Sequence, residues 1–283
     1  GDVAMNSRLA ADAVGATRMD RPEWCAVNPV NGEIYYTLTN NANRKVSPTG
    51  TALQQQVVDA ANPRSFTDAP TATTSPGNVN GHILRMRETA DASNATTFTW
   101  DVYLFGAQAD ADQGMVNLSS LTGDQDFSSP DGLWFSPKTG FAFIQTDDGA
   151  YTDVTNCMML VAKPGKVGDG TTPTLSYTKA DGSKVDIQTR MGAKPTLATL
   201  RRFLVGPVDC EITGCTETPD GKTLFVNIQH PGETITKANI TDPTKFLSHW
   251  PANAGYGAGA AATARPRSAT IAITKNDGGV IGS

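Results

Sequence analysis

One pattern recurs three times along the chain and restricts the folds that the chain can adopt. Each copy begins with a proline and an acidic residue, runs into an apolar strand, turns at a glycine and returns as a second strand that ends in polar residues. The copies span residues 22–41, 130–148 and 207–232, with extra residues inside the third. Repeated hairpins of this kind are typical of β-propeller blades, since a single blade cannot bury both of its faces alone.

The remaining strand-like segments support an all-β fold. Residues 81–88 and 96–105 alternate apolar and polar residues, and they would form the outer pair of the first blade. Further strands are predicted at 157–162, 200–205 and 267–274, with a hairpin over 175–188 that turns at Asp181-Gly182. We therefore predict a β-propeller-like fold of about three blades over residues 1–283. Known propellers close with roughly four to eight blades, so further chain or a second copy would be needed to cover the open edges.

Composition excludes several classes of function. The 283 residues carry a formal charge of −5, which argues against nucleic acid as the main partner. No stretch is long and apolar enough to span a bilayer. The 27 glycines and 17 prolines favour turns over long helices. The chain starts at Gly1 without a signal peptide, as a processed chain would.

Segments outside the repeats give weaker expectations. Residues 7–18 are the best helix candidate, with Ser7 as a possible cap, and we expect this helix to pack across the first hairpin. Residues 42–80 lack periodicity and predict a long surface excursion that could line a cleft. Residues 251–264 are rich in glycine and alanine and predict a flexible loop. Cys210 and Cys215 could form a disulfide, or they could be buried thiols.

Acidic side chains begin each repeat, and these are the candidate metal ligands. In an antiparallel hairpin the start of the first strand and the end of the second lie at the same end. Glu23, Asp131 and Glu211 should therefore share one rim with Asp147, which ends a second strand. Hard cations such as Ca²⁺ need several oxygen ligands at once. The structural alternative is an acid that closes a local turn.

Arg21 stands two residues before Glu23 in an extended segment, so both side chains should point to the same side. Such a pair suits a metal-held phosphate, with Glu23 as metal ligand and Arg21 as donor to phosphate oxygens. The alternative is a surface salt bridge at the start of a strand. His230 could contact metal or substrate, although backbone hydrogen bonds hold a histidine in this position more often.

Several other residues have mainly structural interpretations. Asp148 could add a ligand but fits a loop cap equally well, and Asp209 should point away from Glu211. Blade-core positions are expected for Trp24 and Trp134, the tryptophans that follow the acids of the first two repeats. Structural or solvated positions are expected for the remaining candidates: Asp220, His82, His249, Arg201 and Arg202.

With these residues in hand, the chain resembles the C-terminal half of a PhoX-type alkaline phosphatase. The resemblance rests on Arg21-Pro22-Glu23-Trp24, on Ser129-Pro-Asp-Gly-Leu133, and on the specific block Gln229-His-Pro-Gly232. It runs from the lead-in at residues 9–18 to the final strand. It implies a six-bladed β-propeller, of which this chain would form half, and a secreted or periplasmic location.

The resemblance also implies an activity. Members of the family hydrolyse phosphomonoesters at an iron–calcium cluster in the propeller mouth, so Ca²⁺ and Fe³⁺ are the expected cofactors. The family's N-terminal half, with a cysteine that ligates iron, has no counterpart among these residues. That half or a second copy of the chain is the expected partner. No Gly-x-Ser-x-Gly motif occurs, which fits metal-based rather than serine-based hydrolysis.

Two other functions fit the same residues. A calcium-dependent lactonase or esterase of propeller type would share the carboxylates at the rim without a need for iron. A non-catalytic propeller fragment, acting as a binding module, would fit a chain without the N-terminal ligands.

Overall fold

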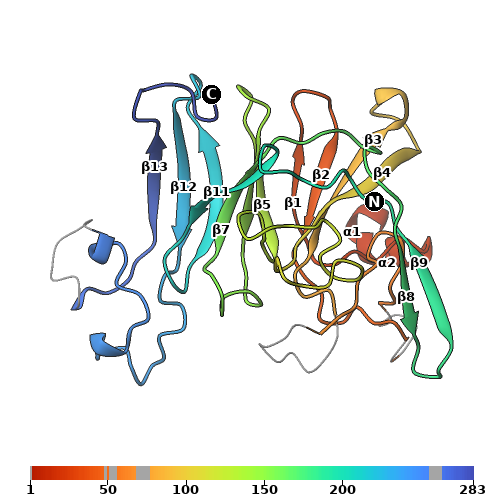
Figure 1. The fold of residues 1–283 in the computed structure, drawn as a ribbon, viewed down its shortest axis with the longest axis horizontal. Helices are drawn as coiled ribbons and strands as arrows, with labels where there is room; N and C mark the ends of the chain where they lie inside the picture. The colour runs from red at the N-terminus through yellow and green to blue at the C-terminus, as the bar shows by residue number, and fades with distance from the viewer. Residues whose placement is uncertain (1, 48–49, 51–55, 68–76, 255–262) are drawn as a thin grey trace.

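Antiparallel sheets stand side by side in the computed structural model of this chain (Figure 1). The structure describes residues 2–47, 50, 56–67, 77–254 and 263–283. Within these residues it contains thirteen β-strands and a few short helices, which confirms the all-β class predicted from the sequence.

Three sheets among the described residues follow the three sequence repeats. The first contains β1 (Pro22–Val27), β2 (Ile34–Leu38), β3 (His82–Glu88) and β4 (Phe98–Phe105), in that spatial order. The second contains β5 (Pro130–Phe135), β6 (Ala142–Thr146), β7 (Met158–Ala162) and β10 (Leu200–Val205), again from first strand to last. The third contains β11 (Glu211–Glu217), β12 (Thr223–Gln229) and β13 (Ala269–Thr274). The repeated hairpins are therefore the opening pairs β1–β2, β5–β6 and β11–β12.

The opening strands of the three sheets are neighbours in space. β5 contacts β1 on one side and β11 on the other. In Figure 1 the third sheet is on the left, the second in the middle and the first on the right. This arrangement places equivalent ends of the three hairpins next to one another.

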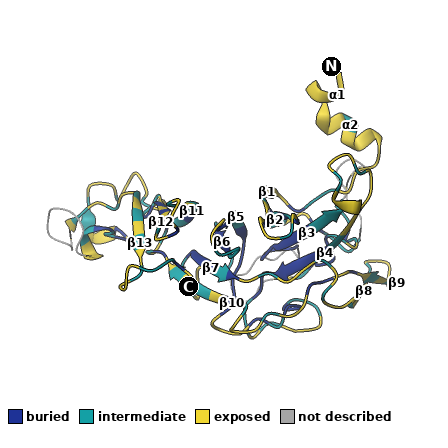
Figure 2. Ribbon diagram, turned by 90° about the horizontal axis from the view of Figure 1, so that it is seen from above, coloured by how far each residue is buried: buried dark blue, intermediate teal, exposed yellow. Residues whose placement is uncertain are grey.

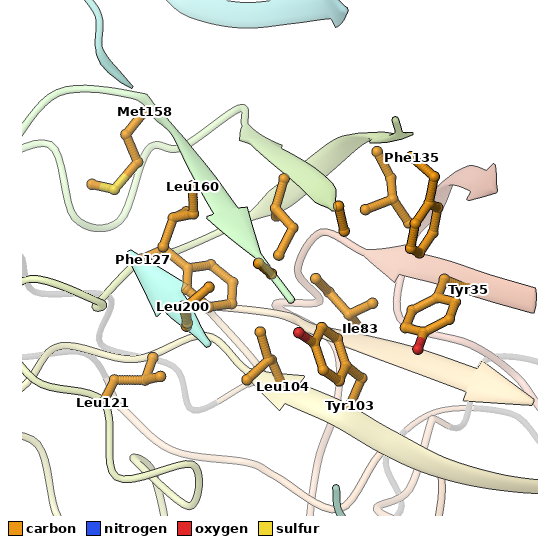
Figure 3. Close-up of a cluster of buried hydrophobic side chains, with 14 of the residues drawn as sticks. Tyr35, Ile83, Tyr103, Leu104, Leu121, Phe127, Phe135, Met158, Leu160 and Leu200 are labelled. Atoms are coloured by element: carbon orange, nitrogen blue, oxygen red, sulfur yellow. The ribbon is translucent and has the colours of Figure 1, made fainter. Parts of the chain in front are cut away.

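Two apolar layers hold the sheets together. Between the first and second sheets, Tyr35, Ile83 and Leu104 pack against Phe127 and Leu160, all fully or almost fully buried (Figure 3). A second layer between the second and third sheets contains Phe143, Met159, Ile212, Val226 and Ile228. Side chains of a strand point alternately to its two faces, so β6 and β7 supply residues to both layers.

A small separate hairpin packs against the first sheet through Leu175. It consists of β8 (Thr174–Thr178) and β9 (Lys184–Gln188), and Gly182 in its turn has a φ of +83°. The chain that leaves β9 pairs with β4, since Val102 N donates to Arg190 O and Gly192 N donates to Val102 O. The chain that follows the predicted Asp-Gly hairpin thus pairs with the otherwise open edge of β4.

The N-terminal helix differs from its expectation. α1 (Asp2–Met5) and α2 (Ser7–Ala13) project from the body of the molecule, as Figure 2 shows, and neither has a buried residue. α2 begins after Asn6 and ends at Ala13 rather than Arg18, because Gly15 takes a left-handed φ of +66° that stops the helix. The expected packing across the first hairpin is therefore wrong. The other short helices are 3₁₀ turns at Thr89–Asp91, Pro243–Lys245 and Ala252–Ala254.

The described part of the segment over 42–80 is not the surface excursion that we expected, although Asp59, Ala60 and Ala61 line a cavity, as that expectation also allowed. Among its described residues, Arg44, Asn62, Arg64 and Asn78 are almost completely buried. Arg64 donates to backbone oxygens of Gly106 and Val116, both at 2.7 Å, and its guanidinium lies over the rings of Phe66 and Phe105. Sequence periodicity did not predict this burial, because the buried side chains in this segment are polar. Most of the predicted loop at 251–264 lies outside the described residues.

We expect Arg64→Met to lower the free energy of unfolding by at least about 3 kcal/mol, because buried acceptors lose their donors. Urea unfolding followed by fluorescence measures this change. Arg87→Met is the matched control, since the Arg87 side chain is 40% exposed and its ion-pair partner among the described residues is Asp91, and it should change stability little. Equal stability of the two variants would contradict the proposed importance of Arg64.

Candidate metal centre

Three carboxylates meet where the opening hairpins converge. Asp131, Asp147 and Glu211 each offer one oxygen, and these oxygens lie within 4.8 Å of one another. Asp131 is on β5, Asp147 directly follows β6, and Glu211 is the first residue of β11. The sequence analysis proposed four ligands, and the structure brings three of them together from two sheets. Glu23, the fourth, is not in this group of three.

The same backbone feature precedes the acid in each repeat. Two positions before Glu23, Asp131 and Glu211, the chain has a non-glycine residue with a left-handed φ: Arg21 (48°), Ser129 (53°) and Asp209 (66°). Such conformations are uncommon outside glycine and cluster at functional sites. The sequence gave no signal for them, because none of the three residues is glycine.

A β-bulge follows in the first two repeats. The register of β1 with β2 shifts between Pro22 and Cys25, and the register of β5 with β6 shifts between Pro130 and Leu133. Glu23 and Asp131 therefore lie inside equivalent bulges. A bulge redirects a side chain and bends its strand. These irregularities therefore help to set the directions in which the Glu23 and Asp131 side chains point.

Arg21 links the first repeat to the second. Its Nε donates to Glu23 Oε1 at 2.9 Å, and its Nη2 donates to Asp147 Oδ2 at 3.2 Å. Burial lowers the pKa of Arg21, but the hydrogen bond to Asp147 and the charges of Glu23 and Asp147 outweigh this and raise it overall. The Arg21 side chain is 44% exposed, so the guanidinium remains accessible from solvent.

The cluster carries more negative charge than its protein partners balance. Burial raises the pKa of Asp131 to about 6, with further contributions from the charges of Glu23, Glu211 and Asp147. Burial and the charge of Asp147 also raise the pKa of Glu211, against the opposing effect of His230. Converging carboxylates that resist ionisation together form a site that a hard cation would stabilise.

Side chains at the end of β12 hold Glu211. Gln229 Nε2 donates to Glu211 Oε2 at 2.6 Å, and His230 Nε2 lies 3.4 Å from the same oxygen. His230 Nδ1 is 3.2 Å from Glu233 Oε2. The sequence analysis considered His230 but gave Gln229 no role. The only signal was the position of Gln229 in the block that carries the family resemblance.

Threonines of β2 hold the backbone beside Asp131. Thr37 Oγ1 donates to Asp131 O at 2.6 Å, and Thr39 Oγ1 donates to Pro130 O at 3.0 Å. Both contacts cross from the first sheet to the second. The sequence analysis missed these residues, since an alternating threonine in a strand is not distinctive.

Other candidates from the sequence lie in local structural roles. Asp148 accepts hydrogen bonds from the backbone of Ala150 and Tyr151, Asp209 accepts from Thr234, and Asp220 caps its turn through Lys222 N. His82 is buried against Asn78 and Ala61 O.

The remaining candidates also have local structural roles, except for Trp24. His249 contacts Ala264 O, and Arg202 pairs with Asp126. Trp134 packs against the second apolar layer. Trp24 is 44% exposed, so its predicted core position is wrong. Trp24 lies in the β1 bulge, where side chains no longer alternate regularly between the two faces of the strand.

The cysteines are not paired. Cys210 is buried and Cys215 is partly buried, and both are free, so the disulfide alternative is not realised. Burial raises the pKa of each thiol to about 12. These residues therefore correspond to the other alternative, a buried small thiol.

Comparison with known proteins shows the family. The model of the family described as alkaline phosphatase PhoX matches residues 1–232. The chain belongs to the PhoX alkaline phosphatase family. This confirms the resemblance recognised in the Pro-acid repeats and in the Gln229–Gly232 block. No curated protein matches the chain significantly.

A solved PhoX structure shows how much of such a protein the chain represents. Pseudomonas fluorescens PhoX in complex with vanadate, a transition state analogue, is 35% identical, with a TM-score of 0.68. The match covers 99% of this chain but 38% of the PhoX chain. Within the described residues, no helix has the length and apolar character needed to cross a bilayer.

We expect the effect of burial and of neighbouring negative charges on the pKa of Asp131 to be measurable in the metal-free protein. Burial, and then the charges of Glu23, Glu211 and Asp147, raise the pKa of Asp131 from the usual 3.8 to about 6 in the folded chain. Stability from this group is therefore lost as the pH rises between these values. Asp131→Asn should raise the melting temperature at pH 8 in the presence of a chelator and lose this advantage near pH 4.

Asp220→Asn is the control for this measurement. Hydrogen bonds from Thr218 and Lys222 lower the pKa of Asp220, so its removal should lower the melting temperature at pH 8. Scanning calorimetry at both pH values separates the two behaviours. An Asp131→Asn variant that is no more stable than wild type at pH 8 would contradict the raised pKa of Asp131.

Proposed function

We propose that this chain forms the carboxylate-bearing part of a PhoX-type phosphomonoesterase. The observation that carries the proposal is the convergence of Asp131, Asp147 and Glu211 beside Arg21, in a chain of the PhoX family. The solved relative binds vanadate, a transition state analogue, which supports an oxyanion as the substrate group.

We further propose that the sheets are blades of a larger propeller. Each of the three sheets starts at its opening strand, and those strands adjoin one another through β5. Residues 1–283 would then provide about three blades of six. The match to 38% of the PhoX chain supports completion by the remainder of such a protein or by a second copy. A periplasmic or secreted location belongs to the same proposal.

The donor set fits hard cations. The ligand candidates Glu23, Asp131, Asp147 and Glu211 all offer carboxylate oxygens, which suit Ca²⁺ and Fe³⁺ better than soft metals. When bound, such ions would neutralise charge on the phosphoryl oxygens and activate an oxygen nucleophile. The four carboxylates would fix the ions on the rim of the opening strands.

Arg21 is placed to bind the substrate. A guanidinium has five N–H donors, and the protein contacts described above use only Nε and one N–H of Nη2. The other donors on this exposed side chain are available for phosphoryl oxygens. Its bonds to Glu23 and Asp147 orient the guanidinium before the substrate arrives, which lowers the entropic cost of binding.

Glu211→Gln tests the metal and the chemistry together. We expect the variant to lose bound metal and to lower kcat/KM for p-nitrophenyl phosphate by at least about 100-fold. Metal content by mass spectrometry and initial rates with added Ca²⁺ and Fe³⁺ measure both effects. Asp220→Asn, a turn acid on the same hairpin, should change neither.

Arg21→Lys tests the substrate contact. We expect the lysine to keep the positive charge but to weaken phosphate binding, so that KM rises at least about tenfold while metal content is unchanged. Unchanged KM and kcat would remove Arg21 from the proposed site.

Two outcomes would favour the other functions. Hydrolysis of a lactone that requires Ca²⁺ alone, without phosphatase activity, would indicate the lactonase class. Absence of bound metal and of both activities in the purified chain would indicate a non-catalytic fragment, an alternative supported by the 38% coverage of the PhoX chain.

A further inference from the structure

A cavity of about 390 Å³ is formed by the first sheet and by the segments that flank β7 and β10. Arg85 of β3 and Tyr103 of β4 form part of its wall. Lys163, directly after β7, and Lys194, in the segment before β10, also line it. The walls belong to the first two sheets and their connections, so the formation of this cavity requires no further blade.

The cavity lies away from the candidate metal centre. β7 runs antiparallel to β6. Asp147 directly follows the last residue of β6, whereas Lys163 directly follows the last residue of β7. The metal centre and the cavity are therefore at opposite ends of the second sheet, and a ligand in the cavity would not touch the carboxylate cluster.

A buried guanidinium in the cavity wall has an unused donor. Arg85 is 1% exposed, and its Nε and Nη2 donate to the two carboxylate oxygens of Asp101 at 2.7 and 3.0 Å. Nη2 also donates to Asp169 Oδ1 at 2.6 Å. The nearby Tyr35 hydroxyl donates its proton to Glu33 Oε2. Nη1 of Arg85 has no hydrogen-bond partner among the described residues, and such a buried group is an exception that calls for a ligand or water.

Other donors in the wall are also available. Within the described part of the chain, the Lys163 ammonium and the Tyr103 hydroxyl make no hydrogen bond. Lys194 Nζ donates to Ser120 Oγ at 2.6 Å, which uses one of the three N–H groups of an ammonium. Both lysines are exposed, so their charges are accessible to a ligand from solvent.

The carboxylate in the wall, by contrast, is already occupied. Asp169 Oδ1 accepts from Ala193 N at 2.8 Å as well as from Arg85, and Oδ2 accepts from Lys166 N at 2.9 Å. Burial alone would raise the pKa of Asp169, but these donors lower it overall. The cavity therefore offers unused donors beside a carboxylate whose oxygens both have partners, and this arrangement suits a ligand rich in acceptors.

The kind of donor indicates the shape of the ligand group. A planar carboxylate pairs best with the fork of an arginine, and Asp101 already occupies the fork of Arg85. Lysines act as point charges and commonly bind phosphate. The available donors come from separate segments of the chain, β4, the end of β7 and the segment before β10. Donors from several directions match a tetrahedral group better than a flat one.

We propose that this cavity binds a tetrahedral oxyanion, the phosphate group of a small molecule or free phosphate. Lys163 and Lys194 supply the charge, and the Tyr103 hydroxyl donates a further hydrogen bond. The site is separate from the proposed phosphatase centre and does not depend on its activity.

Hydrogen exchange of the purified full chain, titrated with inorganic phosphate at constant ionic strength, tests the proposal. We expect slower exchange in residues 163–169 and 191–199, with a Kd below about 1 mM. Because this signal is local, phosphate bound at the metal centre does not contribute to it. Acetate should bind at least about tenfold more weakly. Methyl phosphate and free phosphate, measured side by side, distinguish a phosphate-bearing small molecule from the free ion.

Variants locate the site. Lys163→Gln and Lys194→Gln should each raise the Kd at least about tenfold, because each removes a charge-assisted contact. Tyr103→Phe removes one hydroxyl and should raise the Kd about threefold. Lys184→Gln, at an exposed position of β9, is the matched control and should leave the Kd unchanged, as should Arg21→Gln at the metal centre. Far-ultraviolet circular dichroism confirms that each variant is folded.

Four results would overturn the proposal. These are no protection of residues 163–169 and 191–199 at about 10 mM phosphate, equal protection by acetate, and an unchanged Kd in both cavity-lysine variants. The fourth is loss of the protection in Arg21→Gln, which would assign the bound phosphate to the carboxylate cluster.

Discussion

The structure depends on the burial of both faces of the second sheet. β6 is buried along its whole length, because Ile144 faces the layer shared with the first sheet and Phe143 faces the layer shared with the third. Each outer sheet packs against one side of this central sheet. A stack of this kind fixes the spacing and direction of the opening strands, so β1, β5 and β11 adjoin.

That packing also brings like charges together. Ligand oxygens of the acids at the start of β5 and β11 and after the end of β6 lie within 4.8 Å of one another. Burial, and then the neighbouring negative charges, raise the pKa of Asp131 there. Left-handed residues two positions before Glu23, Asp131 and Glu211, together with the bulges that contain Glu23 and Asp131, hold this unfavourable arrangement. Repulsion that the fold maintains is a reason to infer a cationic ligand, and Arg21 supplies part of the compensation within the protein.

The outer edges of the sheets differ in whether another segment of the chain pairs with them. The chain after β9 pairs with β4, whereas β13 has no such cover among the residues that the structure describes. The N-terminal helices likewise lie away from the sheets, with Leu9 and Val14 largely exposed. Apolar side chains are therefore exposed at the N-terminal helices, and the chain spans 38% of the solved PhoX chain.

The sequence by itself determined the repeat, the opening hairpins and the acids of the rim, because alternation, turn glycines and the Pro-acid spacing are local properties. It also showed the family through the block at Gln229–Gly232. Only the tertiary structure decided that Asp131, Asp147 and Glu211 meet, that Gln229 and Thr37 support them, and that Trp24 faces solvent. These outcomes depend on contacts between residues far apart in the chain and on left-handed conformations at Arg21, Ser129 and Asp209, for which side-chain type gives no local signal.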